Sequence, residues 1–230
     1  MTHSHRRPSG SLVLLSGGMD SATCLALASR RPGPVHALTV LYGQRHAREV
    51  RSARALAHHF RVARHTVVRL PLGPLLASSL TDARRPLPNR RRPTGRIPST
   101  YVPARNTILL SIALGYAESH RLAAIYLGAN AIDYSGYPDC RPEYFRAFER
   151  LARLATKAGV EEGVGVRIVA PLLRLSKAEI VRLGERVGVP WSLTWSCYAG
   201  GRRPCGTCDA CRLREKGFTE AGRRDPVRSG

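Results

Sequence analysis

The chain has 230 residues, 43% of them hydrophobic, and a formal net charge of +21. Its length fits one domain with an appendage or a single large α/β unit. No apolar run approaches the ~20 residues of a membrane span. The basic residues at positions 1–10 are not followed by the apolar segment of a signal peptide, so we expect a flexible tail there and a cytoplasmic protein.

Nearly all of the positive charge comes from arginine, since lysine occurs only at positions 157, 177 and 216. This bias is typical of GC-rich coding rather than of selection for phosphate contacts. The arginine clusters are also scattered and lack interleaved aromatic residues, so we do not expect a nucleic acid as partner.

Strands and helices alternate along the chain. Apolar runs predict strands over 12–15, 35–42, 64–70, 123–127 and 166–173, and helical periodicity predicts helices over 22–30, 44–60, 106–120, 144–158 and 176–187. The last helix begins with a Ser-x-x-Glu capping box. Residues 71–100 are rich in proline and arginine and predict a long loop. Such alternation indicates a Rossmann-like parallel sheet with helices on both faces, over residues 11–190, with ligands bound beyond the carboxyl ends of the strands.

The stretch Ser16-Gly17-Gly18-Met19-Asp20-Ser21 joins the first strand to the first helix. Two glycines there allow a sharp turn with outward-facing amides, and the helix start adds positive potential, so the stretch favours a phosphate chain. An ordinary glycine turn is the alternative. The stretch lacks the Walker pattern and resembles the pyrophosphate loop (PP-loop) of the N-type ATP pyrophosphatases. The resemblance assigns ATP to Leu15, Ser16, Gly17, Gly18, Met19, Asp20, Ser21, Ala22, Thr23, Cys24 and Leu25.

Four of the six cysteines crowd together near the carboxyl end, at Cys197, Cys205, Cys208 and Cys211. Their spacing predicts a tetrahedral, all-thiolate structural zinc site over residues 191–217, followed by a tail over 218–230. An iron–sulfur cluster is the competing use of such a run. Cys24 is expected in the core of the first helix. No cysteine has an evident His and acid partner for a glutaminase, so ammonia is expected free or from a partner.

Three further polar stretches lie at the ends of predicted strands or before a helix: Tyr42–His46, Ser99–Asn106 and Gly128–Arg141, the last containing Cys140. Each alone is also compatible with an ordinary turn. With the glycine loop and the cysteine cluster, in this order, they resemble the 7-cyano-7-deazaguanine synthase family over about residues 12–217. That family usually has one more residue between the first two cysteines, which puts the conformation of 198–204 in doubt.

The resemblance implies an ATP-dependent C–N ligase that converts 7-carboxy-7-deazaguanine and ammonia to the nitrile, through adenylated intermediates and an amide, in queuosine biosynthesis. It implies ATP, Mg²⁺ and Zn²⁺ as cofactors and a homodimer. The expected catalytic residues are Ser16, Asp20, Ser21 and Lys177, with Asp20 capping the first helix or positioning Mg²⁺. The expected substrate contacts are Tyr42, Gln44, Arg45, Arg105, Asp133, Tyr137, Asp139 and Arg141. Another PP-loop enzyme, for tRNA thiolation or amide formation, and a basic zinc-knot RNA-binding protein are the alternatives.

Overall fold

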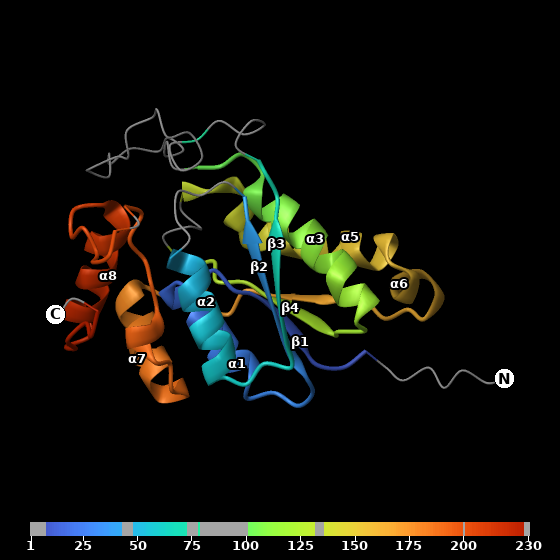
Figure 1. Ribbon diagram of the computed structural model, residues 1–230. Coiled ribbons are helices and arrows are strands. Elements are labelled where there is room, and N and C mark those ends of the chain that lie inside the picture. The colour runs from blue at the N-terminus through green and yellow to red at the C-terminus, as the bar shows by residue number, and fades with distance from the viewer. Residues whose placement is uncertain are drawn as a thin grey trace.

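A parallel β-sheet forms the centre of the computed structural model, which describes residues 8–42, 48–72, 78, 101–131, 136–199 and 201–227 (Figure 1). Its strands are β1 (Ser11–Leu14), β2 (Val35–Leu41), β3 (Arg64–Arg69), β4 (Ala124–Tyr126) and β5 (Arg167–Val169), in the order β3-β2-β1-β4-β5. Val13 lies beside Ala37 of β2 and Tyr126 of β4. The direction of winding reverses between β1 and β4, so the crevice at their carboxyl ends is the expected ligand site.

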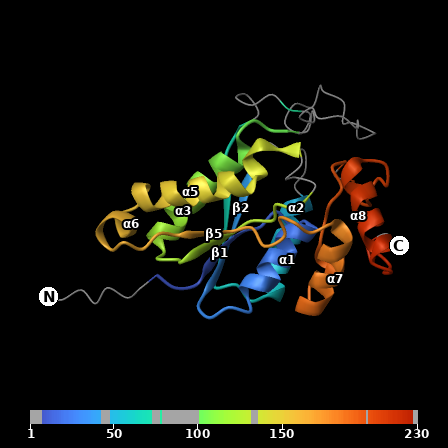
Figure 2. The same ribbon diagram turned by 180° about the vertical axis from the view of Figure 1, so that it is seen from behind.

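Helices cover both faces of this sheet, as Figures 1 and 2 show from opposite sides. One face carries α1 (Met19–Ala28), α2 (Arg48–His59) and α7 (Lys177–Val187), and the other carries α3 (Arg105–Ser119) and α5 (Pro142–Ala155). Side chains alternate along β1, so Val13 joins the first core and Leu12 the second. The remaining elements are α6 (Lys157–Glu161), α8 (Asp209–Glu220) and the short 3-10 turns η1 (Pro138–Cys140) and η2 (Trp191–Leu193). The predicted Rossmann-like class is confirmed.

Local differences from the predicted elements have physical causes. Helix α1 begins at Met19, three residues early, because Gly18 already serves as its N-cap. The single helix predicted over 144–158 is split at Thr156, whose hydroxyl accepts a hydrogen bond from the Gly159 amide and starts α6. The capping box of α7 is confirmed, with Ser176 and Glu179 bonded reciprocally. The stretches 43–47, 73–77 and 79–100, and residues 1–7 of the predicted tail 1–10, lie outside the described residues.

Helix α8 has no counterpart among the predicted elements. It continues to Glu220, and Phe218 is only 2% exposed, so the chain is still part of the core where a tail was expected to begin. Farther on, the carboxylate of Asp225 forms a buried ion pair with Arg214 of α8, at 2.7 Å from Nε. The ordered structure therefore extends past residue 218.

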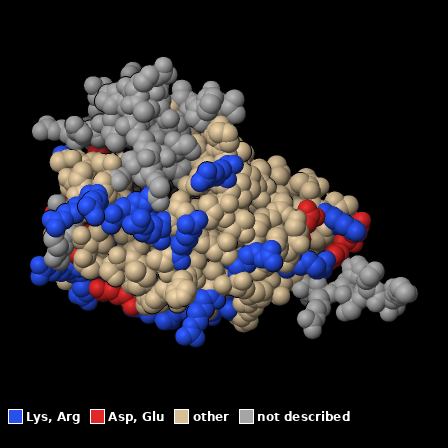
Figure 3. All heavy atoms as spheres, in the orientation of Figure 1, with Lys and Arg blue, Asp and Glu red and all other residues tan. Residues whose placement is uncertain are grey.

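Basic side chains lie in several separate groups on the face shown in Figure 3, with acidic ones between some of them. No described helix combines the length and the apolar character needed to cross a membrane.

Candidate active site

The chain turns between β1 and α1 in a conformation that requires glycine. Gly17 has φ of +91°, and a Cβ there would lie 2.4 Å from the carbonyl oxygen of Glu49. Gly18 then forms the N-cap of α1, without a side-chain hydrogen bond to the helix start. The hydroxyls of Ser16 and Ser21 lie 3.1 Å apart across the turn. The turn therefore places two hydroxyls and a helix N-terminus together, the groups that bind phosphate oxygens.

Asp20 connects three segments that are far apart in the sequence. Its carboxylate accepts two hydrogen bonds from the Lys177 ammonium, at 2.6 and 2.8 Å, and one from the Asn130 amide, at 3.1 Å. Gly128, after β4, allows this approach, since a Cβ there would lie 2.9 Å from the Cβ of Asp20. The N-cap of α1 is Gly18, and Asp20 is the acidic residue of the first turn of the helix. Asp20 thus holds the Lys177 ammonium beside the Ser16–Ser21 loop.

A cavity of about 320 Å³ lies at the carboxyl ends of β1, β2 and β4. Of the residues expected to bind ATP or to act in catalysis, those that line it are Leu15, Ser16, Gly18, Met19, Asp20, Ser21 and Lys177. The others expected to contact ATP lie elsewhere: Gly17 faces the backbone of α2, and Ala22, Thr23, Cys24 and Leu25 are fully buried within α1. Burial raises the pKa of Cys24 well above its usual range, which suits a core thiol.

The residues expected to contact the substrate divide into three groups: those that line the cavity, those that are described but do not line it, and those that lie outside the described residues. Tyr42 and Arg105 line the cavity. Asp139 is buried and accepts a 2.8 Å hydrogen bond from the amide of Asn106, so it holds the first turn of α3. Tyr137 stacks on Tyr101 at 5.8 Å between ring centroids, and Arg141 is exposed at the start of α5. Gln44, Arg45 and Asp133 lie outside the described residues.

The Asp139 contact also positions Cys140, as the side chain of Asn106 binds both residues. Its amide group donates to the Asp139 carbonyl oxygen at 3.1 Å and to the Cys140 sulfur at 3.0 Å. Asn106 and Cys140 both reach the cavity wall. This part of the cavity wall therefore depends on the hydrogen bonds that Asn106 of α3 makes to η1.

Glu49 and Trp195 are among the residues of the cavity wall that sequence reasoning missed. Trp195 donates its amide proton to the Gly17 carbonyl oxygen at 2.9 Å, and the Arg48 guanidinium lies 4.3 Å from its ring centroid. Burial raises the pKa of Glu49 to about 7, although the charge of Arg105 opposes this shift. Only the fold brings these side chains to the loop, because neither belongs to a motif with a recognised spacing.

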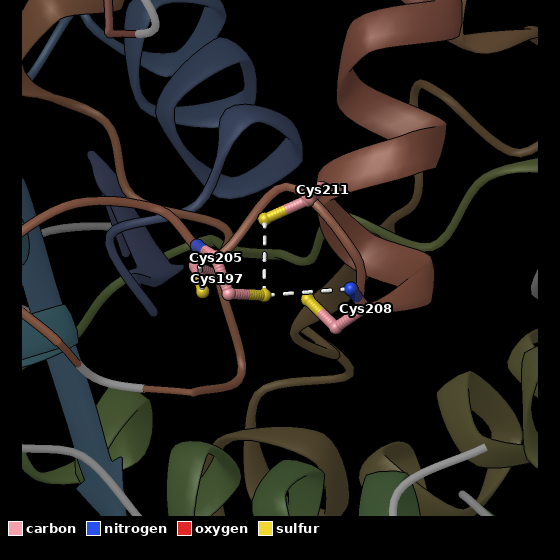
Figure 4. A group of neighbouring side chains, drawn as sticks. All are labelled: Cys197, Cys205, Cys208 and Cys211. Atoms are coloured by element: carbon pink, nitrogen blue, oxygen red, sulfur yellow. Dashed lines mark hydrogen bonds between the residues drawn. The ribbon is translucent and has the colours of Figure 1, made fainter. Parts of the chain in front are cut away.

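The four cysteines near the carboxyl end meet in one place, as predicted. Their sulfur atoms all lie within 4.8 Å of one another, and Figure 4 shows them gathered beside the start of α8. Backbone amides donate to these sulfur atoms: Ala199 and Cys205 donate to Cys197 at 3.3 Å, and Cys208 donates to Cys205 at 3.4 Å. Such donors stabilise thiolates.

This donor set fits zinc. Four thiolates at about 2.3 Å from a Zn²⁺ ion form a closed tetrahedron, and the sulfur separations here need only a small contraction to reach it. Cys205 and Cys211, for example, are 4.0 Å apart. A closed set leaves no position for a substrate, so the group is structural. It also joins the cavity wall, because Cys197 follows Trp195 by two residues and accepts its indole N–H at the carbonyl oxygen, at 3.0 Å.

Comparison with known proteins places this site in a family. The model of the queuosine biosynthesis protein QueC matches residues 10–222. The 7-cyano-7-deazaguanine synthase of Anaeromyxobacter sp. (strain Fw109-5) is 56% identical over 220 residues, 94% of each chain. That of Methylococcus capsulatus is 52% identical over 219 residues, 94% of this chain and 97% of its own. Among solved structures, NMN synthetase from Francisella tularensis has the same fold, with a TM-score of 0.51 and 17% identity, covering 94% of this chain and 79% of that one. The chain belongs to the QueC family of queuosine biosynthesis proteins, and it is similar to relatives named 7-cyano-7-deazaguanine synthase over nearly their whole length.

Proposed function

We propose that this chain converts 7-carboxy-7-deazaguanine and ammonia to 7-cyano-7-deazaguanine at the expense of ATP, in queuosine biosynthesis. The observation that carries the proposal is the loop Ser16–Ser21, which faces a cavity at the switch point of the sheet with Lys177 held on Asp20. Membership of the QueC family supports this substrate.

The chemistry requires two activations. A carboxylate does not react with ammonia, because oxide is a poor leaving group, so transfer of AMP to its oxygen comes first. Ammonia then displaces AMP and gives the amide. Adenylation of the amide oxygen and loss of AMP give the nitrile. Residues of the Ser16–Ser21 loop, with the start of α1 behind them, stabilise the pyrophosphate that departs in each activation.

Lys177 and Asp20 have distinct parts in this proposal. The ammonium of Lys177 neutralises phosphate charge, and Asp20 holds that ammonium at 2.6 Å. When ATP enters with Mg²⁺, the carboxylate of Asp20 supplies an oxygen of the type that Mg²⁺ prefers. Ser16 and Ser21 donate to phosphate oxygens.

The substrate is proposed to lie against Tyr42 and Arg105, where the guanidinium pairs with the carboxylate in a forked arrangement. Gln44, Arg45, Asp133, Tyr137, Asp139 and Arg141 remain proposals as substrate contacts. Zinc holds the segment 191–217 in place. We further propose that the protein is a cytoplasmic homodimer, which sedimentation of the purified protein tests.

Incubation of the purified protein with ATP, Mg²⁺, ammonium and 7-carboxy-7-deazaguanine tests the function, with products identified by mass spectrometry. We expect the nitrile, two AMP and two pyrophosphate for each turnover. AMP and pyrophosphate without the nitrile indicate another acid as substrate. No nucleotide turnover under these conditions contradicts the proposal.

Variants locate the reaction in the cavity. Asp20→Ala, Ser21→Ala and Lys177→Ala are each expected to lower nitrile formation by at least about 10²-fold while the protein keeps its zinc. Lys216→Ala is the matched control, because its side chain is 69% exposed and pairs with Glu220 one turn away, at 3.6 Å. Turnover retained in the three cavity variants contradicts the assigned site.

A further inference from the structure

Glu49 is an acidic residue of the cavity wall, and the proposed adenylation and amide steps assign it no role. It lies in the first turn of α2 and lines the cavity together with Asp20 and Arg105. Within the described part of the chain, its carboxylate makes no hydrogen bond and no ion pair. A carboxylate facing a cavity without such partners is available to a ligand.

The backbone around Glu49 is fixed from two sides. Its carbonyl oxygen packs against Gly17, where any side chain would collide with it. The preceding residue, Arg48, lies over the ring of Trp195, and Trp195 in turn bonds to Gly17. The first turn of α2 is therefore held against the Ser16–Ser21 loop, and the backbone of Glu49 keeps a set position beside that loop.

The proposed reaction needs a proton acceptor at the nitrogen. Ammonium is almost fully protonated at neutral pH, as a lysine side chain is, and in that form it has no lone pair to attack a carbonyl carbon. Each ammonium that becomes an amide must lose two protons. The amide must then lose two more from nitrogen, one as its oxygen is adenylated and one as the nitrile forms. Asp20 is engaged by Lys177, and Arg105 and Lys177 are cations.

We propose that Glu49 is the catalytic base that attracts ammonium and removes its proton. This inference rests on the proposed function. The proton moves to a Glu49 carboxylate oxygen and the freed lone pair forms the C–N bond, while the C–O bond to AMP breaks and AMP leaves with its electrons. The nitrogen of the new C–N bond then loses its second proton to water. Glu49 releases the first proton to water as well. In the second half, it takes the remaining N–H proton of the adenylated amide as the C–O bond breaks and the C≡N bond forms.

The charges around Glu49 suit this task. Among the described residues, the ionisable groups that share its cavity wall are Asp20 of α1, Tyr42 after β2, Arg105 of α3, Cys140 of η1, Lys177 of α7, Tyr198, and Arg214 of α8. Burial dominates over the attraction of Arg105 and raises the pKa of Glu49 to about 7, so the carboxyl both accepts and releases a proton near neutral pH. Below that pKa the group is protonated and inactive as a base.

The isosteric variant Glu49→Gln tests the assignment. It keeps the size and polarity of the side chain but cannot accept the proton. We expect it to release pyrophosphate in a single turnover with 7-carboxy-7-deazaguanine and no ammonium, as the wild type does, because adenylation needs no base at nitrogen. Amide formation is expected to fall by about 10²-fold or more. Glu143→Gln, an exposed first-turn glutamate of α5, is the matched control and is expected to behave as the wild type.

The pH profile separates catalysis from a structural effect. At fixed total ammonium, the wild-type rate is expected to rise up to about pH 7 and then level off. The rate of Glu49→Gln is expected to keep rising at higher pH, because it depends on free ammonia. Equal amide rates, equal pH profiles, or loss of the pyrophosphate release in Glu49→Gln overturn the assignment. Absence of nitrile with the wild type instead overturns the proposed function.

Discussion

Gly17 is the residue on which the shape of the nucleotide loop depends most directly. Its φ of +91° and its contact with the Glu49 carbonyl oxygen leave no room for a side chain. We expect Gly17→Ala to cost about 1–3 kcal/mol of unfolding free energy and to lower ATP turnover strongly. Gly115→Ala is the control, because that glycine lies inside α3 with open space around it, and alanine there is expected to stabilise by about 0.5–1 kcal/mol. Thermal melts and ATP turnover measure both, and a neutral Gly17→Ala contradicts this view of the loop.

Loss of the cysteine cluster is expected to change the cavity, although none of its four cysteines lines the cavity. Cys208→Ala leaves three thiolates, so we expect bound zinc to fall from one equivalent per chain to well below that value. Trp195, two residues before Cys197, then loses its support, and the KM for ATP rises. Metal analysis and steady-state kinetics measure these effects. Cys24→Ala is the control, since this thiol lies in α1, and full zinc content in Cys208→Ala contradicts the assignment.

Elements with a local signal could be predicted from the sequence, and those whose buried face is polar could not. The Ser-x-x-Glu box predicted the start of α7 because both partners of the cap are local. The inward face of α8 consists of Cys211, Arg214, Gly217 and Phe218. Only one of these is a large apolar residue, so no helical periodicity of apolar residues marks it.

The same reasoning applies to the site. The glycine loop and the cysteine cluster are contiguous motifs, whereas Glu49 looks like an ordinary solvated glutamate in the first turn of a helix. Its place beside Gly17 follows from the packing of α2 against the loop, which no spacing in the sequence records. Conversely, Asp139 lies in a polar motif, yet its carboxylate is turned toward the backbone of α3. Residues brought together by tertiary packing therefore need the structure.

At the scale of the whole molecule, a buried cation joins α8 to the chain before and after it. Arg214 binds both carboxylate oxygens of Asp225, at 2.7 and 2.9 Å, the Thr194 hydroxyl at 2.7 Å and the Trp191 carbonyl oxygen at 3.2 Å. Its side chain is only 5% exposed. Trp191 and Thr194 lie just before Trp195 of the cavity wall, and Asp225 lies beyond α8. The network therefore links the chain beyond α8 to the cavity wall.

Asp225→Asn tests whether this network stabilises the molecule as a unit. The substitution keeps the shape of the side chain but leaves the Arg214 charge buried without a counter-ion, so we expect a loss of about 3–5 kcal/mol in unfolding free energy. Arg223→Ala is the matched control, since that arginine pairs with Glu185 at 2.8 Å but is 53% exposed, and its loss is expected to cost less than about 1 kcal/mol. Urea unfolding followed by tryptophan fluorescence measures both variants. A single transition shifted to lower urea in Asp225→Asn indicates that the segment and the sheet unfold together, whereas equal midpoints for the two variants contradict the proposed role of the buried pair.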